Sequence, residues 1–253
     1  MATKKPARPA DDSEAAFLAA YDPTQYPGLA VAVDVVLVAV VDGRLATLVT
    51  PRTEHPFRDR MALPGGFVGP RESLDAAAAR VLHTKAGLVG VFLEQLYTFG
   101  AVHRDPRMRV VSVAYYALVD PARFRASTAR DEAVMATVRV PWAGETGGPV
   151  ELRDADGHRL PLAFDHAEVV GMAVKRLRGK LDWAPIGFQL LGDTFTLLEL
   201  QRVHETVLGR PLNKDSFRRR MLASGQLEAT GIAQQGVDHR PAELYRFARR
   251  SAV

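Results

Sequence analysis

Apolar residues recur along the chain at two spacings, which predict strands and helices in a definite order. The unbroken apolar run from Leu29 predicts a buried strand, and Asp42 with Gly43 predicts a hairpin turn into a returning strand. Helical spacing covers residues 73–85, and Gly87 stands where a helix C-terminal cap belongs. Further elements are strands over 93–99, 110–119 and 137–140 and a helix over about 166–181. This mixture predicts an α/β fold, an α/β/α sandwich around a mixed sheet.

The pattern changes after residue 183. Thr196 and Glu199 have the spacing of a capping box, and apolar residues then recur at helical spacing until Gly209. A second helix is expected over 214–223, and the segments LEATGI and ELYRF, on either side of a polar loop with Pro241, read as two strands. Helix, turn, helix and hairpin is the order of a winged helix-turn-helix domain.

These patterns predict three parts of the chain. Residues 1–20 form a loose tail and a short helix capped by Ser13, residues 21–182 form the α/β domain, and residues 183–253 form the winged helix-turn-helix domain. Composition agrees with a packed protein, because 47% of the residues are hydrophobic and 25% are charged.

Charge and cysteine content narrow the classes of partner. The formal net charge of +4 permits a nucleic-acid partner without requiring one. Zero cysteines exclude disulfides and thiolate metal sites and agree with a reducing compartment. The sequence has neither a signal-peptide pattern nor an apolar run long enough to span a bilayer, so we expect a soluble, cytoplasmic protein without a membrane partner.

A glycine-rich loop precedes the helix of residues 73–85. Glycine lets a backbone approach a ligand, and a helix N-terminus presents free N–H groups, so such a loop and helix can hold a diphosphate. The segment GFVGPRESLDAAAARVLHTKAGL resembles the Nudix box, a glycine, five residues, a glutamate, seven residues, then Arg-Glu-apolar-x-Glu-Glu-x-Gly-apolar. The register agrees at six positions, Gly66, Glu72, Arg80, Leu82, Gly87 and Leu88.

The departures from this pattern determine the expected chemistry. Val81, Thr84 and Lys85 stand where the hydrolases of the Nudix family have three glutamates. Magnesium prefers carboxylate oxygens, and Lys85 brings a positive charge to the place of the cation. We therefore expect no catalytic residues, no metal and no hydrolysis.

Further segments extend the resemblance over residues 21–247. They are YPGLAVAVDVVL, MALPGGFV, LEQLYTFG, RDPRMRVVSVAYYALV, LAFDH, FTLLELQ, FRRRML and RPAELYRF. Together they resemble the NrtR family, the Nudix-related transcriptional regulators of NAD metabolism. The resemblance implies a homodimeric repressor of NAD biosynthesis or salvage genes that binds double-stranded operator DNA. It also implies that ADP-ribose, bound by the Nudix domain as a nucleotide effector, releases the operator, and that no cofactor is needed.

The effector site is expected around the glycine loop and the arginines near it, because a diphosphate suits guanidinium groups. The candidate residues are Arg52, Gly65, Gly66, Phe67, Glu72, Arg80, Arg104 and Arg107. Structural alternatives stay open at several of them. Arg80 can form an ion pair with Glu72, an Asp105 pair can pin the turn RDPR, and Phe67 or Tyr97 can pack in a core instead of stacking on adenine.

The second helix of the C-terminal domain carries the candidate DNA contacts. At 100° per residue, Phe217 and Met221 share the inward face, whereas Ser216 and Arg219 point toward base edges. Phosphate contacts are expected from Lys214, Arg218 and Arg220, with His239 and Arg240 reaching DNA from the wing loop. The alternative is a solvated charged face, and the outward carboxylate of Asp215 opposes part of the DNA prediction.

Two rival functions remain at this point. One is a nucleoside-diphosphate-sugar hydrolase that takes carboxylates from outside the box, such as Glu94 or Glu132. The other keeps DNA binding and uses the α/β domain only as a dimerisation scaffold, indifferent to nucleotides.

Overall fold

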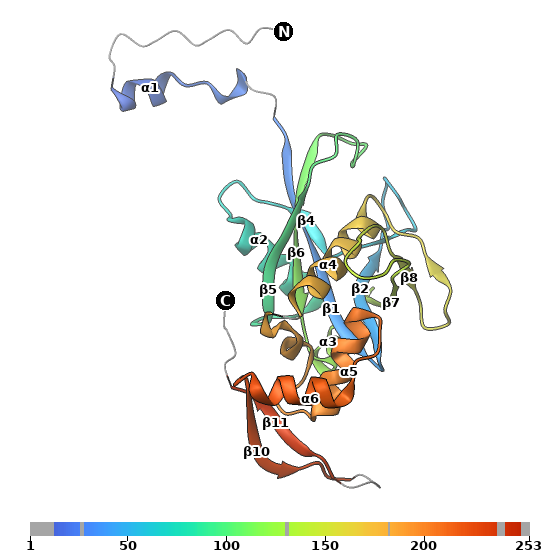
Figure 1. The fold of residues 1–253 in the computed structure, drawn as a ribbon. Helices are drawn as coiled ribbons and strands as arrows, with labels where there is room; N and C mark the ends of the chain where they lie inside the picture. Colours follow the sequence, from blue (N-terminus) through green and yellow to red (C-terminus); the bar gives the residue numbers. More distant parts are fainter. Residues whose placement is uncertain (1–12, 26–27, 130–131, 182, 237–240, 249–253) are drawn as a thin grey trace.

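The computed structural model describes residues 13–25, 28–129, 132–181, 183–236 and 241–248 (Figure 1). The helices are α1 (Glu14–Ala20), α2 (Leu74–Ala86), α3 (Pro121–Thr128), α4 (His166–Lys180), α5 (Leu197–Leu208) and α6 (Lys214–Ala223), with 3-10 helices η1 (Pro23–Gln25) and η2 (Pro185–Leu190). The strands are β1 (Ala30–Val41), β2 (Arg44–Pro51), β3 (Met61–Ala62), β4 (Gly65–Phe67), β5 (Phe92–Phe99), β6 (Val110–Leu118), β7 (Val134–Arg139), β8 (Glu151–Arg153), β9 (Arg159–Leu160), β10 (Leu227–Ala233) and β11 (Glu243–Phe247).

One mixed sheet organises the first domain. Its strands follow the order β5-β6-β1-β2-β7-β8-β9, with β3 paired to β2 and β4 paired to β1. Strand β1 runs parallel to β6, with Val35 opposite Tyr115, whereas β1 and β2 form the antiparallel hairpin predicted at Asp42. The mixed sheet expected from the sequence is therefore confirmed.

Successive residues of β1 face two different helical layers, because side chains alternate across a strand. Val35 and Leu37 belong to the core that α2 and α3 cover, whereas Val36 and Val38 belong to the core that α4 and α5 cover. Both layers exclude water from the sheet, which is why β1 is apolar on both faces. The predicted α/β/α sandwich is confirmed.

The C-terminal domain has its own small core, shared by α5, α6 and the hairpin of β10 and β11. Phe188, Phe195, Leu200, Phe217 and Tyr245 form its centre. The capping box at Thr196 and Glu199 is present, with the Thr196 Oγ1 accepting a 3.1 Å hydrogen bond from the Glu199 N–H. The order α5, α6, β10, β11 confirms the predicted winged helix.

The two domains meet along α4 and α5. Val203 and Val207 of α5 lie in the same core as Val174 and Leu177 of α4. Because α5 packs on both cores, it is a structural part of the junction as well as the first helix of the winged helix. The domain division at residue 183 stays a prediction.

Several elements depart from the sequence prediction. Strand β7 begins at Val134, three residues before the expected start, and α3, β3, β4, β8 and β9 were not predicted. Helix α3 has local signals that could have revealed it, because Asp120 caps its N-terminus and Pro121 occupies its first turn. Strands β8 and β9 are too short to show an alternating pattern.

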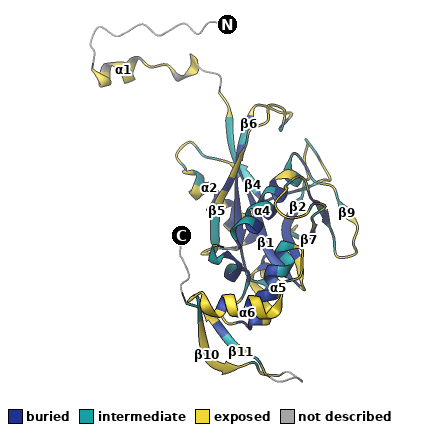
Figure 2. Cartoon of the chain, in the orientation of Figure 1, coloured by how far each residue is buried: buried dark blue, intermediate teal, exposed yellow. Residues whose placement is uncertain are grey.

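Helix α1 lies apart from the rest of the described chain and projects beyond the sheet (Figure 1). Its apolar side chains Phe17 and Leu18 are exposed, and the burial colouring marks the helix as solvent-facing (Figure 2). Within the described ranges, no helix has the length and apolar character needed to cross a membrane.

Candidate ligand cavity and nucleic-acid interface

A cavity of about 210 Å³ lies beside the sheet, where β1, β4, the loop before β6 and the start of α4 meet. The predicted effector residues that line it are Arg52, Gly65, Gly66, Phe67, Arg104 and Arg107. The structure therefore brings together six residues that are spread over more than fifty positions of the sequence. Glu72 and Arg80, which were predicted with them, are not among its lining residues.

Gly65 lies in β4 directly opposite Asp34 of β1. A Cβ atom at Gly65 would stand 2.4 Å from the Asp34 Oδ1 and 3.1 Å from the Val33 carbonyl oxygen. No ordinary side chain fits at this distance, so the glycine is needed to let the two strands approach around the carboxylate.

Arg104 occupies the floor of the cavity, and its side chain is only 5% exposed. Its Nη2 and Nε donate to both carboxylate oxygens of Asp165 at 2.6 Å and 2.9 Å, and its Nη2 also donates to Asp34 at 3.4 Å. Burial alone would lower the pKa of Arg104, but the hydrogen bonds and charge of the two carboxylates raise it. The guanidinium is thus permanently charged and already committed to protein partners.

His166 completes this buried network. Its Nδ1 accepts a 3.0 Å hydrogen bond from the Leu63 N–H, which leaves the Nε2, 3.7 Å from an Asp34 oxygen, to carry the proton. Burial lowers the pKa of His166 more than the neighbouring carboxylates raise it. The side chain is therefore neutral at physiological pH and positions Asp34 against the loop at Leu63.

The sequence did not reveal Asp34, Asp165, His166 or Phe164 as site residues. Asp34 is a carboxylate inside the apolar run of β1, and a buried charge needs a partner, so this single polar position was the available signal. The other three follow one another just before and at the start of α4. Their role becomes visible only when the fold brings α4 next to β1.

Arg107 is more exposed than Arg104, and Arg52 lines the neighbouring groove as well as the cavity. Arg107 forms an ion pair with Asp105 at 2.7 Å, as in the structural alternative to a ligand role. Its side chain nevertheless remains 45% exposed. Arg52 donates to the Pro56 carbonyl oxygen at 2.8 Å, which holds its guanidinium against the cavity wall. Both cations keep donors that a bound anion could use.

Glu72 and Arg80 form an ion pair, which is the structural alternative to a ligand role for Arg80. Arg80 Nε and Nη2 donate to the carboxylate at 2.7 Å and 2.8 Å, and Nη2 also donates to the Phe67 carbonyl oxygen. The hydrogen bonds from Arg80 and from the Gly69 N–H lower the pKa of Glu72 to about 2. The pair fixes the glycine loop from outside the cavity.

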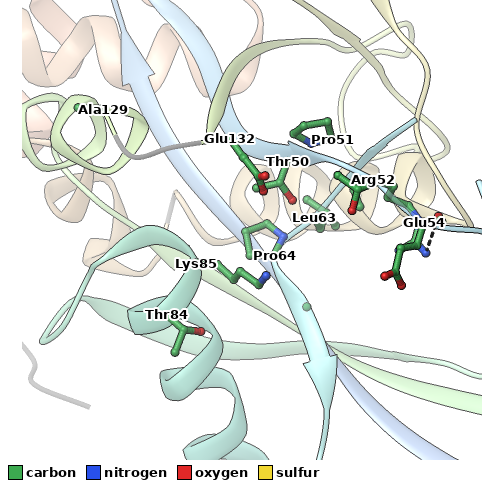
Figure 3. A pocket seen from close by; sticks show the side chains of 13 residues that line it. Thr50, Pro51, Arg52, Glu54, Leu63, Pro64, Thr84, Lys85, Ala129 and Glu132 are labelled. Atoms are coloured by element: carbon green, nitrogen blue, oxygen red, sulfur yellow. Dashed lines mark hydrogen bonds between the residues drawn. The ribbon is translucent and has the colours of Figure 1, made fainter. Parts of the chain in front are cut away.

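A second, larger groove of about 640 Å³ adjoins the cavity and shares Arg52, Leu63 and Gly65 with it. Helix α2 lines this groove with Thr84 and Lys85, at its C-terminal end, and Lys85 extends toward Pro64 (Figure 3). The Ser73 hydroxyl caps the N-terminus of α2 by accepting a hydrogen bond from the Ala76 N–H, and the diphosphate role expected of this terminus stays a prediction. A ligand in the groove meets side chains of α2 and not its free N–H groups.

The three positions where the sequence analysis expects replaced carboxylates, Val81, Thr84 and Lys85, differ in environment. Val81 is 1% exposed and packs in the core, whereas Thr84 and Lys85 face the groove. Glu132 lines the same groove, but Glu94 is engaged by Lys180 and Arg176 elsewhere on the sheet. Among the described residues, Asp154, Asp156 and His158 also gather possible metal-ligand atoms within 4.8 Å, on the turn between β8 and β9.

Helix α6 has the two faces predicted from the sequence. Phe217 and Met221 are buried, whereas Lys214, Ser216, Arg218, Arg219 and Arg220 are exposed (Figure 2). Asn213 caps the helix through the Ser216 N–H, which presents the first turn outward. The DNA roles of these side chains stay predictions, and His239 and Arg240 lie outside the described residues.

Comparison with known proteins covers both domains. Residues 28–147 match the family described as the NUDIX domain, and residues 187–247 match the NrtR DNA-binding winged helix domain. The chain is 37% identical to the "ADPR responsive transcriptional repressor NtrR" of Acinetobacter baylyi, over 93% of this chain and 89% of the relative.

Two further similarities bear on function. The crystal structure of Shewanella oneidensis NrtR complexed with a 27mer DNA superposes with a TM-score of 0.72 and 34% identity, covering 86% of this chain and 93% of that chain. The "ADP-ribose pyrophosphatase" of Methanocaldococcus jannaschii is 28% identical over 56% of this chain and 70% of its own length.

Proposed function

The chain belongs to the NrtR family, and from this premise we propose that it is a transcriptional repressor whose Nudix domain binds ADP-ribose and thereby releases operator DNA. The observation that carries the proposal is the combination in one chain of an arginine-lined cavity and an exposed basic helix on a winged helix. We further propose that the regulated genes belong to NAD biosynthesis or salvage, as the family resemblance implies.

The proposed DNA contacts follow from the two faces of α6. Ser216 and Arg219 lie opposite the buried residues and would face base edges in the major groove, whereas Lys214, Arg218 and Arg220 would contact phosphates. The relative of known structure was crystallised with DNA, which supports this use of the same domain.

The proposed effector contacts come from the cavity and the groove. Arg52, Arg107, Gly65, Gly66 and Phe67 would touch ADP-ribose directly, and Arg104 would position Asp34 and Asp165 beneath it. Glu72 and Arg80 would act by holding the glycine loop in shape. We assign these roles because Arg104 is buried and paired with two carboxylates, whereas Arg107 is exposed and Arg52 lines both the cavity and the groove.

We also propose that the domain is not a hydrolase. Val81 cannot bind a cation, and the ammonium of Lys85 would repel one from the groove where hydrolases hold magnesium. The same ammonium would attract the diphosphate of ADP-ribose, so binding without hydrolysis follows from one residue. Similarity to an ADP-ribose pyrophosphatase makes hydrolysis the second candidate, with Glu132 as its remaining carboxylate in the groove.

We propose a homodimer as the operator-binding form, because a two-fold operator is matched by two winged helices. Helix α1 projects from the body with Phe17 and Leu18 exposed, which supports its packing on a second copy. Sedimentation at several protein concentrations, with Leu18→Glu as the disrupting variant, tests this: a monomer at all concentrations contradicts it.

The repressor proposal is tested on DNA fragments that the protein enriches from the genome of its own organism. Fluorescence anisotropy should give specific binding that ADP-ribose weakens. Arg219→Ala should cost about 1–3 kcal/mol and relax sequence preference, whereas Arg218→Ala should weaken all sequences alike and reduce the salt slope. Absence of sequence-specific binding at moderate salt contradicts the proposal, and identical behaviour of the two variants contradicts the face assignment.

Binding of ADP-ribose and its hydrolysis are measured on the same preparation of the protein. Calorimetry with ADP-ribose should detect binding without added magnesium, and AMP should not accumulate when magnesium is added. Release of AMP that Glu132→Gln abolishes would favour the hydrolase, and no heat at millimolar ADP-ribose would favour a scaffold indifferent to nucleotides.

A further inference from the structure

Phe164 stands in the cavity wall with a strained backbone. Its φ is 50°, in the left-handed region, and Phe57, which packs edge-to-face against it at 4.8 Å between ring centroids, has a φ of 63°. Left-handed backbone is unfavourable for bulky side chains, and such strain collects where a side chain must be aimed for function. The strain therefore indicates that the direction of the Phe164 ring matters.

Neighbouring anchors hold Phe164 in this conformation. The Ala163 N–H donates to the Met61 carbonyl oxygen at 2.8 Å, and the Asp165 carboxylate is bound by Arg104. Both residues next to Phe164 are thus fixed by partners from other elements. The ring is positioned before any ligand arrives, which reduces the entropy lost on binding.

Cations surround the Phe164 ring. The Arg52 guanidinium lies 4.9 Å from its centroid and the Arg107 guanidinium 5.9 Å, and Arg107 also lies 5.8 Å from the centroid of Phe67. Arg107 is therefore within cation–π range of two rings that line the same cavity. A planar guanidinium between aromatic side chains marks a place where another planar group can stack.

The cavity and the adjoining groove differ in character. The cavity carries Phe67 and Phe164. The described residues that line the groove include no aromatic side chain and bring together two cations, Arg52 and Lys85, and two carboxylates, Glu54 and Glu132. Arg52 and Gly65 line both. Together, the cavity and the groove suit a ligand with a planar ring at one end and an anionic group in the middle or at the other end.

We infer that Phe164 is the stacking wall for the nucleobase of the effector, and that the base enters the place now held by the Arg107 guanidinium. This rests on the proposed function and adds an orientation to it: the base lies in the cavity, and the diphosphate passes Arg52 toward Lys85. The Asp105 pair keeps Arg107 at the opening, where the displaced guanidinium covers the other face of the base.

The orientation predicts selectivity for ligands that carry a base. Stacking on an aromatic side chain is tolerant of base identity, so purine nucleoside diphosphate derivatives should bind similarly. Ribose 5-phosphate and inorganic pyrophosphate, which lack a base, should bind far more weakly than ADP-ribose.

The test uses calorimetry on the full-length protein with ADP-ribose, ADP, ribose 5-phosphate and pyrophosphate. Phe164→Leu should weaken ADP-ribose binding about 10- to 100-fold and leave pyrophosphate binding unchanged, whereas Phe164→Tyr should retain affinity within a few fold. Tyr97→Leu is the matched control, because Tyr97 is an exposed aromatic on β5 that lines neither the cavity nor the groove.

The outcomes separate this inference from the proposed function. If the wild-type protein binds ADP-ribose and Phe164→Leu binds it equally well, the stacking role is wrong and the effector proposal stands. Equal loss of ADP-ribose and pyrophosphate binding in Phe164→Leu, with Phe164→Tyr also impaired, contradicts the stacking role as well. If the wild-type protein binds none of the four ligands, the effector proposal and this inference fail together.

Discussion

The two ends of α4 are each fastened by a buried arginine, but the acceptors differ. At the N-terminal end, Arg104 donates to the carboxylates of Asp165 and Asp34 in the cavity. At the C-terminal end, Arg178 donates to backbone carbonyl oxygens, those of Val207 and Gly144 at 2.8 Å and that of Trp142 at 3.3 Å. Burial lowers the pKa of Arg178, whereas the carboxylates raise that of Arg104.

Because the acceptors differ, the two ends of α4 should respond to different changes. A network of one guanidinium and two carboxylates responds to a new charge, and an anionic effector would bring one. The carbonyl acceptors at the other end, of which that of Val207 lies in the last turn of α5, respond to geometry, because Arg178 caps that helix and joins it to α4. We therefore expect helix α4 to convert an electrostatic change at the cavity into a displacement at the winged helix.

The largest effect is expected from removing the charge of Arg104 at the N-terminal end of α4, which is called the charged end below. Arg104→Met removes one partner of a buried ion pair and leaves Asp165 and Asp34 uncompensated, which should lower the free energy of unfolding by about 3–5 kcal/mol. Urea denaturation followed by circular dichroism measures it. Arg125→Met is the control, because its pair with Asp42 is exposed and should contribute about 0–1 kcal/mol. Equal losses in the two variants would contradict the distinction between buried and exposed pairs.

A smaller loss of stability, but a specific loss of regulation, is expected at the other end. Arg178→Met leaves buried carbonyl oxygens without a donor and should cost about 1–3 kcal/mol. We expect the variant to bind operator and ADP-ribose separately, while ADP-ribose no longer weakens operator binding. The measured quantity is the ratio of operator Kd values with and without ADP-ribose, because coupling between two sites is a property of that ratio. A wild-type ratio in the variant would contradict the role of α4.

The sequence predicted what local patterns encode. The hairpin at Asp42, the capping box at Thr196 and the apolar face of Phe217 and Met221 each depend on residues close in sequence, and all are present. The predicted arginines of the cavity also converge. The sequence did not predict which of these arginines is free to bind a ligand. Whether Arg104 or Arg107 is free depends on which carboxylates the fold brings near.

Arg178 illustrates the same limit at the junction. The residue is 6% exposed because α5 and the loop at Trp142 close over it, and neither contact has a signal in the sequence around Arg178. A periodic pattern assigns α4 a buried face, but it does not say which elements cover that face. Long-range packing thus determines the contacts of Arg178, which the sequence did not predict.

The charged end should also be sensitive to pH through His166. Its folded-state pKa lies below the ordinary value of 6.5 because of burial, so the unfolded state binds the proton first as the pH falls. The free energy of unfolding should therefore decrease, by up to about 1 kcal/mol, between about pH 7 and about pH 5.5. His166→Gln should lack this part of the slope in parallel denaturation series. A slope unchanged by the substitution would mean that other histidines cause it.

The smallest effect is expected from a charged contact at the C-terminal end, where Lys180 of α4 donates to a Glu94 oxygen of β5 at 2.6 Å. The two side chains are 17% and 28% exposed, and Arg176 lies 3.6 Å from the same carboxylate, so Glu94 keeps a cation when Lys180 is lost. Lys180→Met should therefore cost no more than about 1 kcal/mol. Because solvent reaches this pair, the cost should shrink when denaturation is repeated at about 1 M instead of about 0.1 M salt, whereas the cost of Arg178→Met should not change. If Arg178→Met proved to be the salt-sensitive variant, its end of α4 would be held by charge after all, and the contrast between the two ends would be lost.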